Sequence, residues 1–192
     1  MSVTSSTLSK ILPKKYKHKK EAIAEILAAV SQNKHLVPVM DKFVFNDGTT
    51  KNLLSLSGTI LMYYGGKGYN IPVSLWLDES YPRTAPICYV KPTCEMMLLP
   101  GKHVNSNGQI LLPYLNDWRH TACDLHSLIQ VISLTFGESL PVCLRPTKEE
   151  SQSNCAAAQR HSNIYSTPEG DSYMLLRQDD GLPIQRENET CC

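Results

Sequence analysis

The sequence of 192 residues lacks any long hydrophobic run and has almost no net charge, and each absence excludes a class of protein. No run of about 18 apolar residues occurs, as a membrane-spanning helix would need, and the N-terminus is polar rather than an apolar signal region. The formal net charge of +1 provides no overall attraction to nucleic acid or to anionic membranes. We therefore expect a protein of the cytosol or the nucleus that has no membrane span and no nucleic-acid partner.

The cysteines do not form the pattern of a disulfide framework or of a zinc site. There are 7 of them, an odd number, at irregular spacings and without a C-x-x-C pair. No G-x-G-x-x-G signature follows residue 146, which excludes a dinucleotide-binding domain there. We expect no metal and no cofactor. The cysteines should be reduced and mostly structural: Cys88, Cys94, Cys123, Cys143, Cys155, Cys191 and Cys192.

Lysines form one basic run near the N-terminus. A solvated helix flank is the simplest interpretation of such a run, and binding to nucleic acid or phosphoinositide is the alternative. The only aromatic residue within it is Tyr16, and the near-neutral net charge favours the solvated flank. The run consists of Lys10, Lys14, Lys15, Lys17, Lys19 and Lys20.

Apolar periodicity predicts helices at both ends of the first 146 residues. Residues 21–32 and 124–136 place apolar side chains three and four positions apart, as in helices with one face on a core. The Thr-Ala-Cys-Asp sequence at residues 121–124 predicts the start of the second helix. A shorter helix is expected over residues 5–12, ended by Pro13.

The middle of the chain has the composition of strands. Three runs rich in β-branched and aromatic residues cover residues 36–45, 53–64 and 69–77, and a shorter one covers 87–90. The sequences at 46–49 and 65–68 contain residues that tolerate turns. We predict an α+β domain over residues 1–146, with a four-stranded antiparallel meander flanked by N- and C-terminal helices.

Residues 147–192 have a different composition. They are polar and lack periodicity, so they cannot bury enough apolar area to offset the entropy of ordering, and we expect a disordered tail. Met174, Leu175 and Leu176 form a candidate short docking element within it, although three apolar residues in such a tail more often have no role. No sustained heptads occur, so no coiled coil is expected.

The first 146 residues resemble the ubiquitin-conjugating enzyme variant (UEV) domains of ESCRT-I. The resemblance covers residues 5–146 and is carried by strings that occur in one order: FVFNDG at 43–48, GYNIPVSLWL at 68–77, PICYVKPT at 86–93, GKHV at 101–104 and LPYLNDW at 112–118. It implies a ubiquitin-conjugating-enzyme-like fold and a non-catalytic domain that acts in endosomal sorting of ubiquitinated cargo and its transport to the lysosome or vacuole. A cytoplasmic location on endosomes is implied as well.

The resemblance also implies that the enzyme's nucleophile is missing. Conjugating enzymes carry a cysteine shortly after an Asn-Gly pair, and aligning Asn107 and Gly108 with that pair places Leu111 at the cysteine position. A leucine cannot form a thioester, because the reaction needs a thiolate. The rival hypothesis is a conjugating enzyme or conjugation cofactor that uses a displaced thiol, with Cys94 or Cys88 as the candidate.

In this family a groove binds Pro-Thr/Ser-Ala-Pro peptides. Tyrosine faces can hold a preformed polyproline helix at small entropic cost, and an asparagine can bond peptide carbonyls and the Thr or Ser hydroxyl. A tyrosine on a strand is, without the resemblance, more often a packing residue. The lining carried over is Thr59, Tyr64, Tyr69, Asn70, Ile71, Pro72, Val90, Thr93, Met96, Leu140 and Val142.

This sequence departs from the family at one end of that groove. Glu-Pro-Pro-Val of the family appears here as Ser-Leu-Pro-Val at residues 139–142, and family prolines are replaced by Leu61 and Tyr63. Leu140 keeps the apolar area but loses the rigid shape of proline, which corresponds to a change of roughly 1 kcal/mol of either sign. Peptide binding is still expected.

The resemblance implies a second surface, which contacts the apolar patch of ubiquitin. It consists of the first predicted hairpin, with Val44, Asn46 and Asp47, and of Tyr89, where the family has phenylalanine. Asp-Gly is also the common sequence of a plain hairpin turn. The expected partners are therefore ubiquitin, ubiquitinated cargo and proteins with Pro-Thr/Ser-Ala-Pro motifs. Assembly with ESCRT-I subunits is not expected, because no coiled coil is visible.

Overall fold

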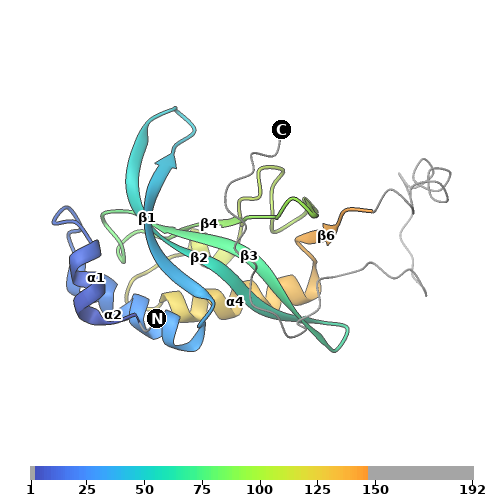
Figure 1. The fold of residues 1–192 in the computed structure, drawn as a ribbon, viewed down its shortest axis with the longest axis horizontal. Helices are drawn as coiled ribbons and strands as arrows, with labels where there is room; N and C mark the ends of the chain where they lie inside the picture. Colours follow the sequence, from blue (N-terminus) through green and yellow to red (C-terminus); the bar gives the residue numbers. More distant parts are fainter. Residues whose placement is uncertain (1–2, 147–192) are drawn as a thin grey trace.

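The computed structural model describes residues 3–146 as an α+β fold in which helices cover one face of an antiparallel sheet (Figure 1). Two helices come first, α1 (Ser5–Ile11) and α2 (Lys19–Gln32). Four strands follow, β1 (Leu36–Val44), β2 (Thr50–Tyr64), β3 (Lys67–Leu77) and β4 (Ile87–Val90). The predictions of a disordered tail, of a docking element in it and of no coiled coil concern residues 147–192, which lie outside the described residues.

The four strands form a meander in the order β1-β2-β3-β4, and each neighbouring pair is antiparallel. This confirms the predicted sheet. The second turn is shorter than predicted, because Lys67 already pairs with Tyr64 and only Gly65 and Gly66 remain between the strands. Both glycines have positive φ, 56° and 77°, as a tight two-residue hairpin requires.

Helix α4 (Leu125–Glu138) packs against β2 and α2 and closes the core. Its start is fixed by Asp124, the last residue of the predicted start sequence 121–124, whose Oδ1 accepts the N–H of Ser127 at 2.8 Å. The hydroxyl of Ser133 donates to the carbonyl of Leu61 at 2.6 Å and holds the helix to the end of β2. The buried cluster between helices and sheet includes Ile26, Leu54, Leu56, Ile60, Ile71, Val73, Leu128, Ile132 and Phe136.

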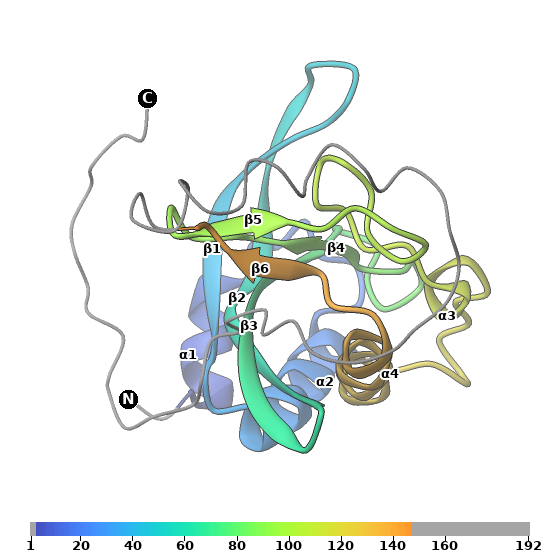
Figure 2. The ribbon, with the colours of Figure 1, turned by 90° about the vertical axis from the view of Figure 1, so that its right-hand side faces the viewer.

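Three elements were not predicted. The short strands β5 (Met96–Leu98) and β6 (Val142–Leu144) pair in a second, two-stranded antiparallel sheet (Figure 2). A four-residue helix, α3 (Pro113–Asn116), precedes α4. In the described part of the chain, no helix is long and apolar enough to cross a membrane.

Candidate functional site

The turn between β1 and β2 forms a tongue, residues 44–50, that extends beyond the sheet (Figure 1). Asp47 orders its tip by accepting two bonds from Thr49 at Oδ1, from the N–H at 2.9 Å and from the hydroxyl at 2.7 Å. These bonds lower the pKa of the Asp47 carboxyl, so the exposed tip is negatively charged at neutral pH. Gly48, with φ of 81°, completes the turn.

An aromatic cluster on the sheet face opposite the helices supports the base of the tongue. Phe43, Leu53 and Trp76 are buried there, and the Phe43 ring lies 4.8 Å from that of Phe45 and 6.3 Å from that of Tyr89. Sequence reasoning identified Tyr89 but missed Phe43 and Trp76, because only the pairing of β1, β2 and β3 brings their rings onto one face. The cluster connects the tongue to β4.

The four predicted ubiquitin-contact residues lie on the tongue and at its base, with Val44 on the opposite face of the hairpin from Phe43 and Tyr89. Val44 is 59% exposed, Asn46 and Asp47 are exposed at the tip, and half-buried Tyr89 lies at the base of the tongue. The tongue thus exposes one apolar side chain, an amide and a carboxylate.

The loop after β5 brings His103 and Leu111 together. The N–H of Leu111 donates to the carbonyl of His103 at 2.8 Å, and the Leu111 side chain is 44% exposed. Between them, Asn105 Oδ1 accepts the N–H groups of Asn107 and Gln109 at 3.0 and 2.9 Å. Hydrogen bonds from its own polar groups order the loop, and the exposed Leu111 side chain directly follows it.

Neither candidate thiol lies in an activating environment. Cys88 is buried on the core side of β4, opposite Leu75, and burial strongly raises the pKa of its thiol. The pKa shift disfavours the thiolate that a thioester would need. Cys94 is exposed, and it has no ion pair or side-chain hydrogen bond among the described residues.

The predicted peptide-contact residues divide by exposure. Tyr69, Ile71, Val90, Met96 and Val142 are buried in the main core. The residues with accessible surface are Thr59, Tyr64, Asn70, Pro72, Thr93 and Leu140. The predicted platform of two tyrosine faces is thus reduced to one, Tyr64, which is 40% exposed, while Tyr69 is only 7% exposed.

The edge of β3 that faces away from β2 is only partly paired. Strand β4 covers it from Val73 to Trp76, and the N–H of Lys91 adds one bond to the carbonyl of Pro72 at 2.9 Å. Backbone N–H and C=O groups of alternate residues point to the same edge of a strand, so those of Gly68 and Asn70 point to the edge at which the Pro72 carbonyl bonds Lys91. Among the described residues they have no partner at that edge, so an extended peptide could pair there.

The side chain of Asn70 lacks a partner at this edge. Its Oδ1 is buried and accepts no hydrogen bond from the described residues. A buried polar atom without a partner costs roughly 1–3 kcal/mol of folding free energy, and a ligand that donates to it would recover part of that cost. Cross-strand pairing places Thr59 opposite Pro72 on the same face of the sheet as Asn70.

The small β5–β6 sheet holds the remaining groove residues. Met96 pairs with Leu144, and Leu98 with Val142. The N–H of Leu99 donates to the carbonyl of Pro141 at 2.8 Å and fixes the segment that carries half-buried Leu140. Leu140 packs against the main core, so it fills space where the family has proline.

The sequence model of the family described as "UEV domain" matches residues 7–144. The chain belongs to the UEV family. It is 46% identical over 151 residues to the mouse Tumor susceptibility gene 101 protein, covering 79% of this chain and 38% of that protein. The human protein of that name is 47% identical over 146 residues, with coverages of 76% and 37%. The UEV chain thus spans less than two-fifths of the length of these relatives.

Solved structures share the fold of this UEV domain. The yeast vps23 UEV domain in complex with a vps27 PSDP peptide matches with a TM-score of 0.61 at 25% identity, over 77% of this chain and 97% of that one. A complex of the Vps23 UEV with ubiquitin matches with a TM-score of 0.55 at 28% identity, over 68% and 89%. The predicted family and fold class are confirmed.

Proposed function

We propose that this UEV domain is a non-catalytic module that binds ubiquitin and Pro-Thr/Ser-Ala-Pro peptides in ESCRT-I-type endosomal sorting. The observation that carries the proposal is that two structures of its fold hold a PSDP peptide and ubiquitin, while this chain has both an incompletely paired strand edge and an exposed tongue. The proposal places the protein on endosomes, where it contributes to the transport of ubiquitinated cargo.

For the peptide, the open edge of β3 provides the main-chain contacts. Gly68 and Asn70 pair with an extended ligand, and the Asn70 amide accepts a bond from the ligand's Thr or Ser hydroxyl or from its backbone N–H. The exposed ring of Tyr64 packs on a proline of the motif, because an aromatic face suits the preformed polyproline helix. Thr93 and Leu140 border the site.

For ubiquitin, the tongue and Tyr89 provide the contact. Val44 gives apolar area for the apolar patch of ubiquitin, and Asn46 and Asp47 bond polar groups around it. The surface is small, so the contact belongs with weak, transient signalling interfaces that bury less than about 1,200 Å².

We infer that Leu111 stands at the position of the catalytic cysteine and that the domain forms no thioester. The raised pKa of the buried Cys88 thiol supports this, since it counts against the rival hypothesis of a displaced nucleophile. Incubation with activating enzyme, ubiquitin and ATP should give no reductant-sensitive adduct on a non-reducing gel. An adduct that the Cys94→Ser variant abolishes would support the rival hypothesis.

Calorimetric titration with a Pro-Thr-Ala-Pro peptide tests the peptide site. Asn70→Ala removes the unpartnered amide, so it should weaken binding by about tenfold, equivalent to about 1.4 kcal/mol, without lowering the free energy of unfolding. The matched control is Asn107→Ala in the loop before Leu111, which should leave the affinity unchanged. Equal affinities for wild type and Asn70→Ala would contradict the proposed site.

A further inference from the structure

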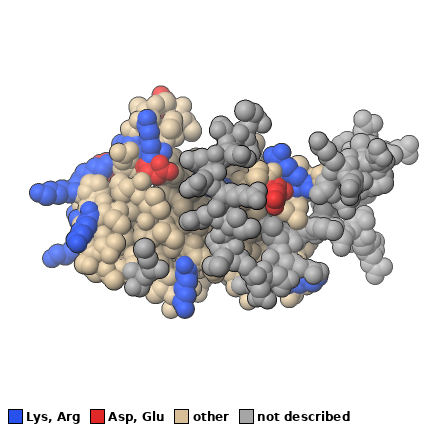
Figure 3. Space-filling model, viewed as in Figure 1, with Lys and Arg blue, Asp and Glu red and all other residues tan. Residues whose placement is uncertain are grey.

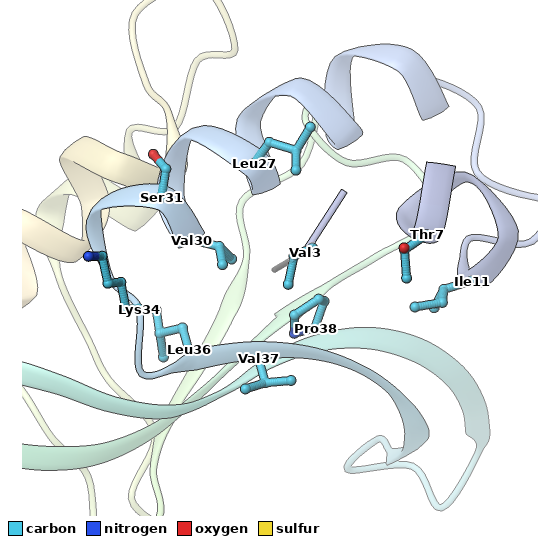
Figure 4. A pocket seen from close by; sticks show the side chains of 10 residues that line it. All are labelled: Val3, Thr7, Ile11, Leu27, Val30, Ser31, Lys34, Leu36, Val37 and Pro38. Atoms are coloured by element: carbon cyan, nitrogen blue, oxygen red, sulfur yellow. The ribbon is translucent and has the colours of Figure 1, made fainter. Parts of the chain in front are cut away.

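An apolar groove lies between α1, α2 and β1, on elements that carry neither the tongue tip nor the open β3 edge (Figure 4). It has a volume of about 1150 Å³, as large as many small-ligand sites. Buried Leu36 and Pro38 of β1 face it, and Val37 between them points to the opposite face of the strand. The walls are formed by Val3, Thr7, Ile11, Leu27, Val30, Ser31, Lys34, Leu36, Val37 and Pro38.

The chain segments around the groove carry positive charge only. Residues 3–11 and 27–38 contain Lys10 and Lys34 and no Asp or Glu. Figure 3 shows Lys and Arg side chains projecting from the end of the molecule where α1 lies. The groove therefore suits an apolar segment with acidic residues on its flanks.

One segment of this chain has that chemistry. Residues 169–180 read EGDSYMLLRQDD, in which Tyr173–Leu176 forms an apolar run with two acidic residues on each side; Arg177 directly after the run leaves the segment with a net charge of −3 (four acidic residues and one arginine). The acidic flanks are Glu169 and Asp171 before the run, and Asp179 and Asp180 after it. Apolar side chains would fill the groove while the carboxylates face Lys10 and Lys34.

The connecting chain is long enough for this contact. The random-coil relation gives an average span of about 30 Å for a chain as long as residues 147–172, and a domain of this size has a radius of gyration of about 15 Å. A tether of this kind gives an effective concentration in the millimolar range. A contact too weak to persist between separate molecules would therefore be occupied within one chain.

We propose that Tyr173–Leu176 docks in cis in the groove between α1, α2 and β1. The docked segment leaves the tongue and the β3 edge uncovered. It is therefore a third contact of the protein, independent of the ubiquitin and peptide sites, and a partner with a similar acidic-flanked apolar segment would displace it.

The test compares two-dimensional NMR spectra of the isotope-labelled full chain with those of variants. Leu175→Asp should shift the signals of Ile11, Leu27, Val30 and Val37, whereas the control Leu182→Asp, with the same change in the tail, should not. Neither variant alters residues 3–146, so shifts at the groove report release of the segment rather than unfolding.

The reciprocal pair of variants reverses the charge of one exposed lysine. Lys34→Glu at the groove should move the signals of Met174–Leu176, and Lys42→Glu, which is exposed and does not line the groove, should leave them in place. Identical groove signals in wild type, Leu175→Asp and Leu182→Asp would overturn the proposal. Groove shifts that vary with protein concentration would also overturn it, because they would assign the segment to another copy of the chain.

Discussion

The Phe43 ring packs on Trp76 with centroids 5.1 Å apart and planes inclined at 57°. The contact joins β1 to β3 below the tongue, where Phe43 is 8% and Trp76 5% exposed. Packing at its base therefore supports the tongue in addition to the pairing of β1 with β2. Ubiquitin binding should depend on this aromatic contact as well as on the residues that touch ubiquitin.

Phe43→Ala should lower the free energy of unfolding by about 3 kcal/mol, because it leaves a cavity in a small cluster. It should also weaken ubiquitin binding while sparing the peptide site, since the tongue loses its support. Urea unfolding and separate titrations with ubiquitin and peptide provide the measurement. Val39→Ala on the same strand is the control. An equal loss of affinity for ubiquitin and for the peptide would point to general unfolding and would contradict the supporting role of Phe43.

The Tyr16 hydroxyl connects the N-terminal region to two strands. It accepts the N–H of Leu54 at 2.8 Å and donates to the carbonyl of Leu77 at 2.9 Å, both in the buried interior. Tyr16→Phe keeps the ring but leaves both groups unpartnered, so it should cost about 1–3 kcal/mol. Urea unfolding measures this cost, and unchanged stability would show that the two backbone groups find other partners.

Stability should also fall at high pH because of this hydroxyl. Burial raises the pKa of Tyr16 from the ordinary 10.0 to about 12, so the folded state holds the proton after the unfolded chain has released it. The stabilisation is complete below pH 10 and is lost as the pH rises toward about 12. The free energy of unfolding of Tyr16→Phe should decline less steeply over that pH range. Identical slopes in the two proteins would contradict this assignment.

Position 58 requires a glycine, because the pairing of β1 with β2 brings backbone close to it. Its φ is 149°, and a Cβ there would lie 1.9 Å from the carbonyl oxygen of His35. Gly58→Ala should therefore destabilise the sheet by about 3 kcal/mol or more. Gly101→Ala, where a Cβ meets nothing within 4 Å, should change the melting temperature little. A stable Gly58→Ala variant would show that the β1–β2 register can shift.

Local signals in the sequence predicted most of the fold. Helix α4 begins at its Asp124 cap, α1 ends before Pro13, and the four strands of the meander were found from their composition and turns. Each of these features depends on neighbours a few residues away. The pairing of Met96–Leu98 with Val142–Leu144 was missed, because three-residue strands carry no periodicity and their partners are far apart in sequence.

The candidate site was predicted through the family resemblance, and the fold determined which residues are accessible. Tyr69 looked like a ligand platform in sequence, yet it faces the helices, because it lies opposite Met62 on the core side of the hairpin. The unpartnered Oδ1 of Asn70 is equally invisible in sequence, since it depends on which groups the fold packs around that side chain.

The most direct test of the central claim is a two-dimensional NMR titration of the labelled full chain with a Pro-Thr-Ala-Pro peptide and, separately, with ubiquitin. We predict peptide-induced shifts at Tyr64, Asn70 and Thr93, ubiquitin-induced shifts at Asn46 and Asp47, and little overlap between the two sets. A folded chain whose spectrum is unchanged by both ligands would contradict the account.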